Sequence, residues 1–146
     1  MGAIVDEYLA LVNRISAGIA FPAVRGLSLS PDDATGHVAE FCALELADGS
    51  VGLSYLCLGY GRAHLREVLS AEPIEGRDAR GVAQLYAAGD PAQRALGFAA
   101  VNAISQYLFA RAGFIPDATT SSVSLLAPSE RDHVGMVGLF PPLVPP

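Results

Sequence analysis

The feature that most constrains this fold is the dipeptide Asp48-Gly49, which separates two strand-like runs within residues 37–58. An Asp-Gly pair readily adopts the positive φ angles that a tight hairpin turn requires. We therefore predict that the two runs are antiparallel strands, joined by a turn in which Asp48 and Gly49 are the two central residues.

A two-residue turn also predicts the register of this hairpin. Cys42 then lies opposite Tyr55, and Ala47 lies opposite Ser50, because the loop length decides which residues pair. Side chains alternate between the two faces of a strand, so one face is mostly apolar and is predicted to cover the core. That face is predicted to carry Val38, Glu40, Cys42, Leu44, Leu46, Val51, Leu53, Tyr55 and Cys57.

The residues on either side of the hairpin predict one more strand and several helices. Apolar residues at helical spacing predict an amphipathic helix over 3–17. Partial alternation over 23–30 predicts a short strand. After the hairpin the apolar period changes to that of a helix, which predicts short helices over 62–70 and 78–88.

The strongest helix start in the sequence is at Asp90, with Pro91 in the first helical position. An N-cap aspartate accepts hydrogen bonds from free backbone N–H groups, and proline already has the φ angle of the first turn. The helix is predicted to run over 91–111 and to end at Gly113. Most of its circumference is apolar, so we expect it to be largely buried. Its polar residues gather on the remaining side: Arg94, Asn102, Ser105 and Gln106.

The C-terminal part of the sequence has a different character. Residues 117–132 mix Ser, Thr, Pro and charged residues and are predicted to form a linker. The apolar run from His133 resembles a buried strand, yet no chain remains after it for a parallel crossover. The predicted fold class is therefore α+β: an N-terminal helix and a three-stranded antiparallel meander followed by helices over 1–116, plus an orphan C-terminal strand within 133–146.

Charge and composition argue against several classes of protein. The net charge is −6, and all 9 basic residues are arginines, so no basic stripe is available to bind nucleic acid. No apolar run reaches the roughly 18 residues that a membrane span needs, and the N-terminus lacks the pattern of a signal peptide. Two separated cysteines do not make a disulfide framework. We expect a cytoplasmic protein that binds neither nucleic acid nor a membrane.

The sequence offers few metal ligands. In the predicted register Cys42 and Cys57 form a diagonal pair about 7–8 Å apart between their Cα atoms, with Glu40 opposite Cys57. These three residues are a candidate metal site; the alternative is that the cysteines act as small hydrophobic residues. His64 and Glu67 lie three residues apart on a predicted helix, where they either bind an ion or form a solvated helix face.

Two glycine-containing segments resemble ligand-binding loops. The segment 59–61 (Gly-Tyr-Gly) follows a strand and precedes a helix, as in dinucleotide-binding proteins. His64 stands where the third small residue of that motif would be, so a glycine hinge is the alternative. Gly135 and Gly138 stand at the end of the orphan strand, where open α/β sheets bind ligands; alternatively, they only allow tight packing.

Three segments stand out together: DGSVGLSY at 48–55, RALGFAAVNA at 94–103 and VGMVGLFPPL at 134–143. In this order they resemble a bacterial and archaeal family of heavy-metal chelation proteins. The resemblance implies two lobes, the first similar to the enolase N-terminal fold and the second Rossmann-like, with a site in the cleft between them. This sequence is expected to depart from that pattern, with the Rossmann-like lobe missing beyond its first strand and turn. Half of an inter-lobe site is therefore expected here.

The resemblance also implies which residues face the cleft. Gly138, Phe140 and Pro141, in the turn after the orphan strand, are expected to contact a ligand through the backbone. Asn102 and Tyr55 of the first lobe are expected to position its polar groups. The ligand is expected to be a small molecule or a divalent or heavy-metal ion. The expected partner is a Rossmann-like lobe of the same or another chain, or a second copy in a homo-oligomer.

Three functions remain open from the sequence. The first is a ligand-binding or metal-binding lobe of a two-lobed chelation protein. The second is part of an enzyme that acts on a small anionic metabolite. The third is a structural module that self-associates. The mean hydropathy of +0.38 and the charged fraction of 16% favour self-association, because they imply more apolar surface than one small core hides.

Overall fold

Three antiparallel strands form the sheet, in the order β1-β2-β3. They are β1 (Val24–Leu29), β2 (Phe41–Leu46) and β3 (Val51–Tyr55). The computed structural model describes residues 3–29, 41–56, 61–115, 129 and 131. The chain divides into two units, Met1–Phe114 and Ile115–Pro146, and all the described helices and strands lie in the first.

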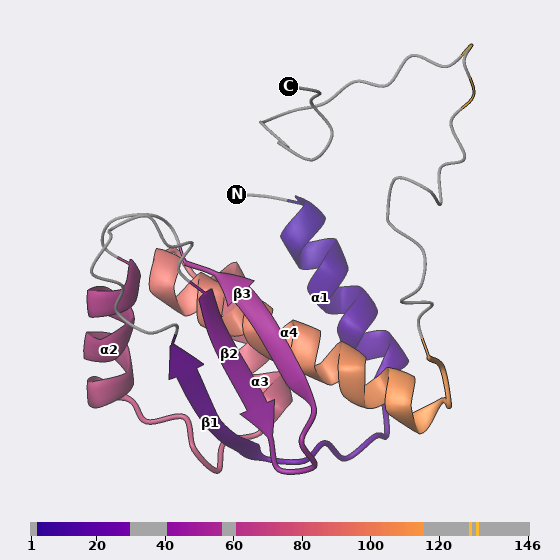
Figure 1. Ribbon diagram of the computed structural model, residues 1–146, viewed down its shortest axis with the longest axis horizontal. Helices are drawn as coiled ribbons and strands as arrows, with labels where there is room; N and C mark the ends of the chain where they lie inside the picture. Colours follow the sequence, from indigo (N-terminus) through magenta and orange to yellow (C-terminus); the bar gives the residue numbers. More distant parts are fainter. Residues whose placement is uncertain (1–2, 30–40, 57–60, 116–128, 130, 132–146) are drawn as a thin grey trace. The chain divides into compact units, whose positions relative to one another are not determined.

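The helices are α1 (Ala3–Ile15), α2 (Gly61–Ala71), α3 (Ala79–Ala83), the short 3-10 helix η1 (Gln84–Ala87) and α4 (Pro91–Arg111). In Figure 1 α4 crosses behind the sheet, and it packs on β3 and β2. The predicted α+β class is thereby confirmed, and the helix predicted over 78–88 is divided into α3 and η1. In the part of the chain that the structure describes, no helix combines the length and the apolarity that would let it span a membrane.

The register of the hairpin differs by one residue from the predicted one. The observed partners are Cys42 with Ser54 and Leu44 with Gly52. The loop has three residues rather than two, because the Gly49 N–H donates to the carbonyl oxygen of Leu46 and the Leu46 N–H donates to that of Ser50. Gly49 has φ +92°, as expected for the left-handed residue that ends a three-residue hairpin loop.

One extra loop residue reverses the faces of one strand relative to the other. On β2 the buried residues are Cys42, Leu44 and Leu46, as predicted. On β3 the prediction is wrong, since Gly52 and Ser54 are the buried residues. Val51, Leu53 and Tyr55 instead lie exposed on the open face of the sheet, next to Phe41. Val38, Glu40 and Cys57 lie outside the described residues.

Helix α4 approaches β3 so closely that only glycine fits between them. A Cβ atom on Gly52 would lie 2.0 Å from the carbonyl oxygen of Ala99 and 2.2 Å from the backbone nitrogen of Ala103. The Asn102 side chain donates from Nδ2 to the carbonyl oxygen of Leu53 across the same contact, at 2.7 Å. This contact holds the middle of β3 against the middle of α4.

The start of α4 is as predicted. Asp90 is the N-cap, its Oδ1 accepts from the Gln93 N–H at 2.9 Å, and Pro91 occupies the first helical position. Gly113, with φ +64°, follows the last turn. The core gathers around the buried face of α4, and its largest apolar side chains are Leu44, Leu46, Leu56, Leu65, Ile74, Leu96 and Ile104. The predicted linker and orphan strand lie outside the described residues, apart from Ser129 and Arg131.

Candidate functional site

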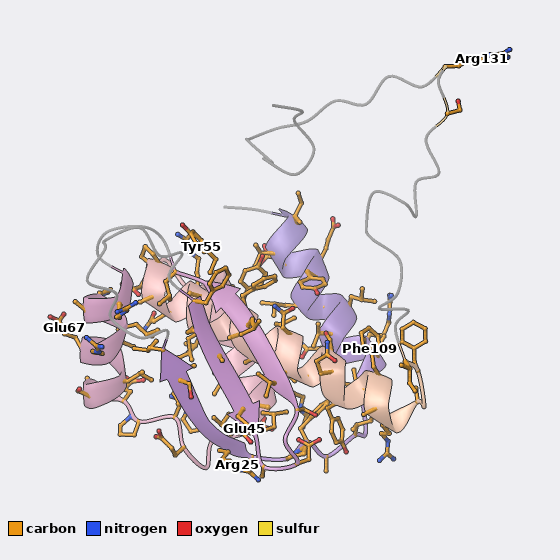
Figure 2. The ribbon with its side chains drawn as sticks, viewed as in Figure 1. Arg25, Glu45, Tyr55, Glu67, Phe109 and Arg131 are labelled. Atoms are coloured by element: carbon orange, nitrogen blue, oxygen red, sulfur yellow. The ribbon has the colours of Figure 1, made fainter. Side chains whose placement is uncertain are left out.

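A solvent-open hollow of about 300 Å³ lies where β3 ends and α4 begins. Figure 2 shows Tyr55 at this end of the sheet, opposite the end that carries Arg25 and Glu45. The residues that give the hollow its chemistry are Ser54, Tyr55, Tyr86, Arg94 and Phe98. They come from β3, η1 and α4, so the hollow depends on the close packing of these elements.

Side chains of different chemistry meet at this hollow, because successive residues of β3 point to opposite faces of the sheet and because α4 begins here. Ser54 points toward the helices and is buried, whereas Tyr55 lies on the open face of the sheet. Arg94 stands one turn into α4, behind the Asp90 cap. Its guanidinium group adds to the positive end of the helix dipole. A cation beside phenol hydroxyl groups is suited to a small anionic ligand.

Aromatic rings line the helical side of the hollow. The Tyr86 and Phe98 rings lie 5.0 Å apart between centroids. Tyr8 of α1 continues this row, with its ring 6.4 Å from that of Tyr86 and nearly perpendicular to it. On the sheet, Phe41 and Tyr55 form a second edge-to-face pair at 5.4 Å. The hollow therefore offers flat apolar surfaces as well as a cation.

The two predicted first-lobe residues, Tyr55 and Asn102, have different surroundings in the structure. Tyr55 lines the hollow. Asn102 lies two turns after Arg94 on α4, and its side chain donates a hydrogen bond to the carbonyl oxygen of Leu53. The sequence reasoning missed Arg94 as a site residue. The sequence feature that marks Arg94 is its position in the first turns of a helix, where the helix dipole disfavours a cation. Gly138, Phe140 and Pro141 lie outside the described residues.

Cys42 has the surroundings of a core residue. It is fully buried on the helix-facing side of β2, and burial raises the pKa of its thiol to about 11. A metal-binding cysteine must lose its proton, so this buried thiol does not fit a metal ion. Among the residues that the structure describes, no group of three histidine, cysteine or carboxylate side chains converges on one point.

His64 of α2 joins two carboxylates on opposite sides of its ring. Its Nε2 lies 2.6 Å from Asp90 Oδ2, and its Nδ1 lies 3.5 Å from Glu67 Oε2. The hydrogen bond to Asp90, followed by that to Glu67, raises the pKa of His64. The backbone N–H of Gln93, followed by His64, lowers the pKa of Asp90. Because the carboxylates take opposite ring nitrogens, this trio is an ion-pair link between α2 and α4 rather than a metal site.

This link predicts a pH dependence of stability. A raised histidine pKa contributes stability that is fully present below the unfolded value of 6.5 and is lost as the pH rises through the folded value. We expect His64→Gln to cost more stability at about pH 5.5 than at about pH 8.5. Urea denaturation of both proteins at both pH values measures this difference. An equal cost at the two pH values would contradict the link.

The described part of the chain is thus an α+β domain with an antiparallel sheet, an open sheet face and a solvent-open hollow at one end. Residues 38–105 match the model of a family described as "Putative heavy-metal chelation". The family resemblance predicted from the sequence is thereby confirmed over these residues. No curated protein and no solved structure matches the chain significantly.

The match covers β2, β3, α2, α3, η1 and most of α4, and so includes most of the hollow. The description of that family names heavy-metal chelation. Within the described residues, however, the polar groups of the hollow fit an anion better than a bare metal ion, since they comprise a guanidinium and hydroxyl groups.

Proposed function

We propose that this chain is the enolase-like first lobe of a two-lobed heavy-metal chelation protein. We further propose that the hollow lined by Tyr55 and Arg94 is the part of the inter-lobe site that this lobe contributes. The observation that carries the proposal is the character of this hollow. It is open to solvent and combines a cation with aromatic surfaces. An anionic group that itself holds a metal ion fits such a wall.

The direct metal ligands that we propose are Glu40 and Cys57. Glu40 precedes Phe41 in the chain, and Cys57 follows Tyr55 by two residues. Phe41 and Tyr55 are cross-strand partners with their rings in contact, and in the chain the two candidate ligands lie one residue before Phe41 and two residues after Tyr55. Cys42, the third residue of the candidate trio, has a buried and protonated thiol, and the proposal does not depend on it.

Cadmium titration tests these ligands. We expect Cys57→Ser to abolish the ultraviolet charge-transfer absorption of a thiolate–cadmium bond, because Cys57 supplies the thiolate. Glu40→Gln is expected to weaken binding by about tenfold or more. Cys42→Ser is the matched control and is expected to leave the absorption unchanged.

Two results would contradict this assignment. One is an unchanged cadmium absorption in Cys57→Ser. The other is loss of the absorption in a Cys42→Ser protein that remains folded by circular dichroism. The second result would mean that the buried thiol becomes accessible and supplies the ligand.

The same hollow supports a second candidate function, an enzyme that acts on a small anionic metabolite. Arg94 favours this alternative because it stands at the positive end of α4 within the hollow. Turnover of a small carboxylate or phosphate substrate distinguishes the two, since a chelator binds its ligand without converting it.

A further inference from the structure

Helix α1 has two apolar stripes, and only one of them packs against the described core. Leu9 and Val12 are buried against the core. A second stripe faces solvent and consists of Ile4, Tyr8, Leu11 and Ile15, whose exposed fractions are 82%, 36%, 39% and 53%. Its spacing of three and four residues places all four side chains on one side of the helix. A helix that packs only on its own core needs no such second stripe.

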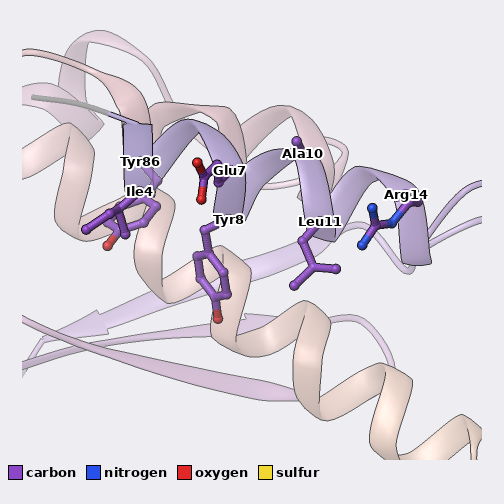
Figure 3. A pocket seen from close by; sticks show the side chains of 7 residues that line it. All are labelled: Ile4, Glu7, Tyr8, Ala10, Leu11, Arg14 and Tyr86. Carbon is purple, nitrogen blue, oxygen red and sulfur yellow. The ribbon is translucent and has the colours of Figure 1, made fainter.

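Three residues of this stripe, all except Ile15, line a hollow of about 590 Å³ that also includes Glu7, Arg14 and Tyr86. Figure 3 shows Tyr8, Leu11 and Arg14 in succession along the helix, with Glu7 near its first turn and Ala10 at its middle. The surface is therefore shaped to receive an elongated apolar partner rather than water alone.

The charges beside the stripe are complementary under a two-fold rotation. Glu7 and Arg14 lie seven residues apart on the same flank, which is about 10.5 Å along the helix axis. Neither makes an ion pair in the described part of the chain. The point midway between them lies beside Ala10 and Leu11. If a second α1 packs antiparallel about this point, each Glu7 meets the Arg14 of the other copy.

We propose that the exposed face of α1 is the interface through which two copies of this chain associate, with their α1 helices antiparallel. Leu11 then lies beside the two-fold axis. Tyr8 packs between Leu11 and Ile15 of the second copy, and Ile15 packs between its Ile4 and Tyr8. The same surface serves both copies, as in most homodimers.

The charges favour a second copy over an unrelated partner, because one acidic and one basic residue at equal distances from the centre match the stripe itself. An acidic or a basic peptide would leave one of them unmatched. The helix has 13 residues and is about 20 Å long, so the interface is smaller than the roughly 800 Å² per partner of a stable complex. The expected dimer is therefore weak, with a dissociation constant in the micromolar range.

Charge-swap variants test this geometry. In Glu7→Arg and in Arg14→Glu, two like-charged pairs face each other across the dimer, and we expect each variant to raise the dissociation constant by about tenfold or more. A mixture of the two variants restores both opposite-charge pairs and is expected to form a heterodimer. The double variant is expected to dimerise like the wild type. Sedimentation velocity over the micromolar range measures all four.

Leu53→Thr is the matched control, since Leu53 is exposed to 57% on the sheet and lies outside the proposed interface. It is expected to leave the dissociation constant unchanged. A wild-type protein that stays monomeric at every concentration would overturn the proposal. In that case the C-terminal segment or another molecule, rather than a second copy, would be the partner of α1. A second result would also overturn the proposal: the charge-swap variants dimerise like the wild type, whereas Leu53→Thr dimerises more weakly. That result would place the interface on the open sheet face.

Discussion

Replacing Gly97 by alanine is expected to lower the free energy of unfolding by about 3 kcal/mol or more. A Cβ atom there would lie 2.0 Å from the backbone nitrogen of Tyr86 and 2.5 Å from the carbonyl carbon of Leu85. Both atoms belong to the backbone of η1, so no side-chain rotation relieves the overlap, and α4 must move away from η1. Urea denaturation of the variant and the wild type measures the loss.

Gly81→Ala is the control for this substitution. Gly81 is also helical, but a Cβ atom on it meets nothing closer than the Asp78 carboxylate, at 4.0 Å. Alanine is favoured over glycine in a helix, so Gly81→Ala is expected to raise the free energy of unfolding by about 0.5–1 kcal/mol. If Gly97→Ala proves as stable as Gly81→Ala, then α4 and η1 do not approach each other as closely as described.

Gly52→Ala is expected to cost a similar amount, about 3 kcal/mol. Here the added methyl group would strike the backbone of α4 at Ala99 and Ala103. Moving α4 away would also break the hydrogen bond from Asn102 to Leu53 and open the core beneath β3. The free energy of unfolding from urea denaturation is again the measurement.

Gly26→Ala is the matched strand control. Gly26 lies in β1, and a Cβ atom on it meets nothing within 4 Å. Its replacement is expected to change the free energy of unfolding by no more than about 0.5 kcal/mol. Equal effects at Gly26 and Gly52 would contradict the register that places Gly52 against α4, and a larger loss at Gly52 would support it.

The hairpin illustrates how far local sequence patterns reach. Asp48-Gly49 correctly predicted two antiparallel strands and the turn between them. It did not distinguish a two-residue loop from a three-residue loop, because Asp-Gly is compatible with both. That single residue decides which side of β3 is buried. Ser54 therefore lies in the core, while Leu53 and Tyr55 lie on the surface.

Which residues surround the hollow likewise depends on how the elements pack. Tyr55 and Arg94 both line it, but no local sequence pattern connects these two residues. Their positions in the chain are almost forty residues apart, and only the packing of α4 on β3 brings them together. Asn102, expected beside Tyr55, is instead used to join the helix to the strand. The roles of Gly138, Phe140, Pro141, Glu40 and Cys57 stay predictions.

The sequence by itself determined the type and the approximate ends of the described helices and strands, including the cap at Asp90 and the α4 helix that follows it. Those features depend on interactions between residues a few positions apart, which leave clear periodic and capping patterns. Only the tertiary structure decided which face of β3 is buried, where Gly52 and Gly97 admit no side chain, and which residues surround the hollow. These depend on the distance between whole elements, and a difference of one loop residue or one methyl group is enough to change them.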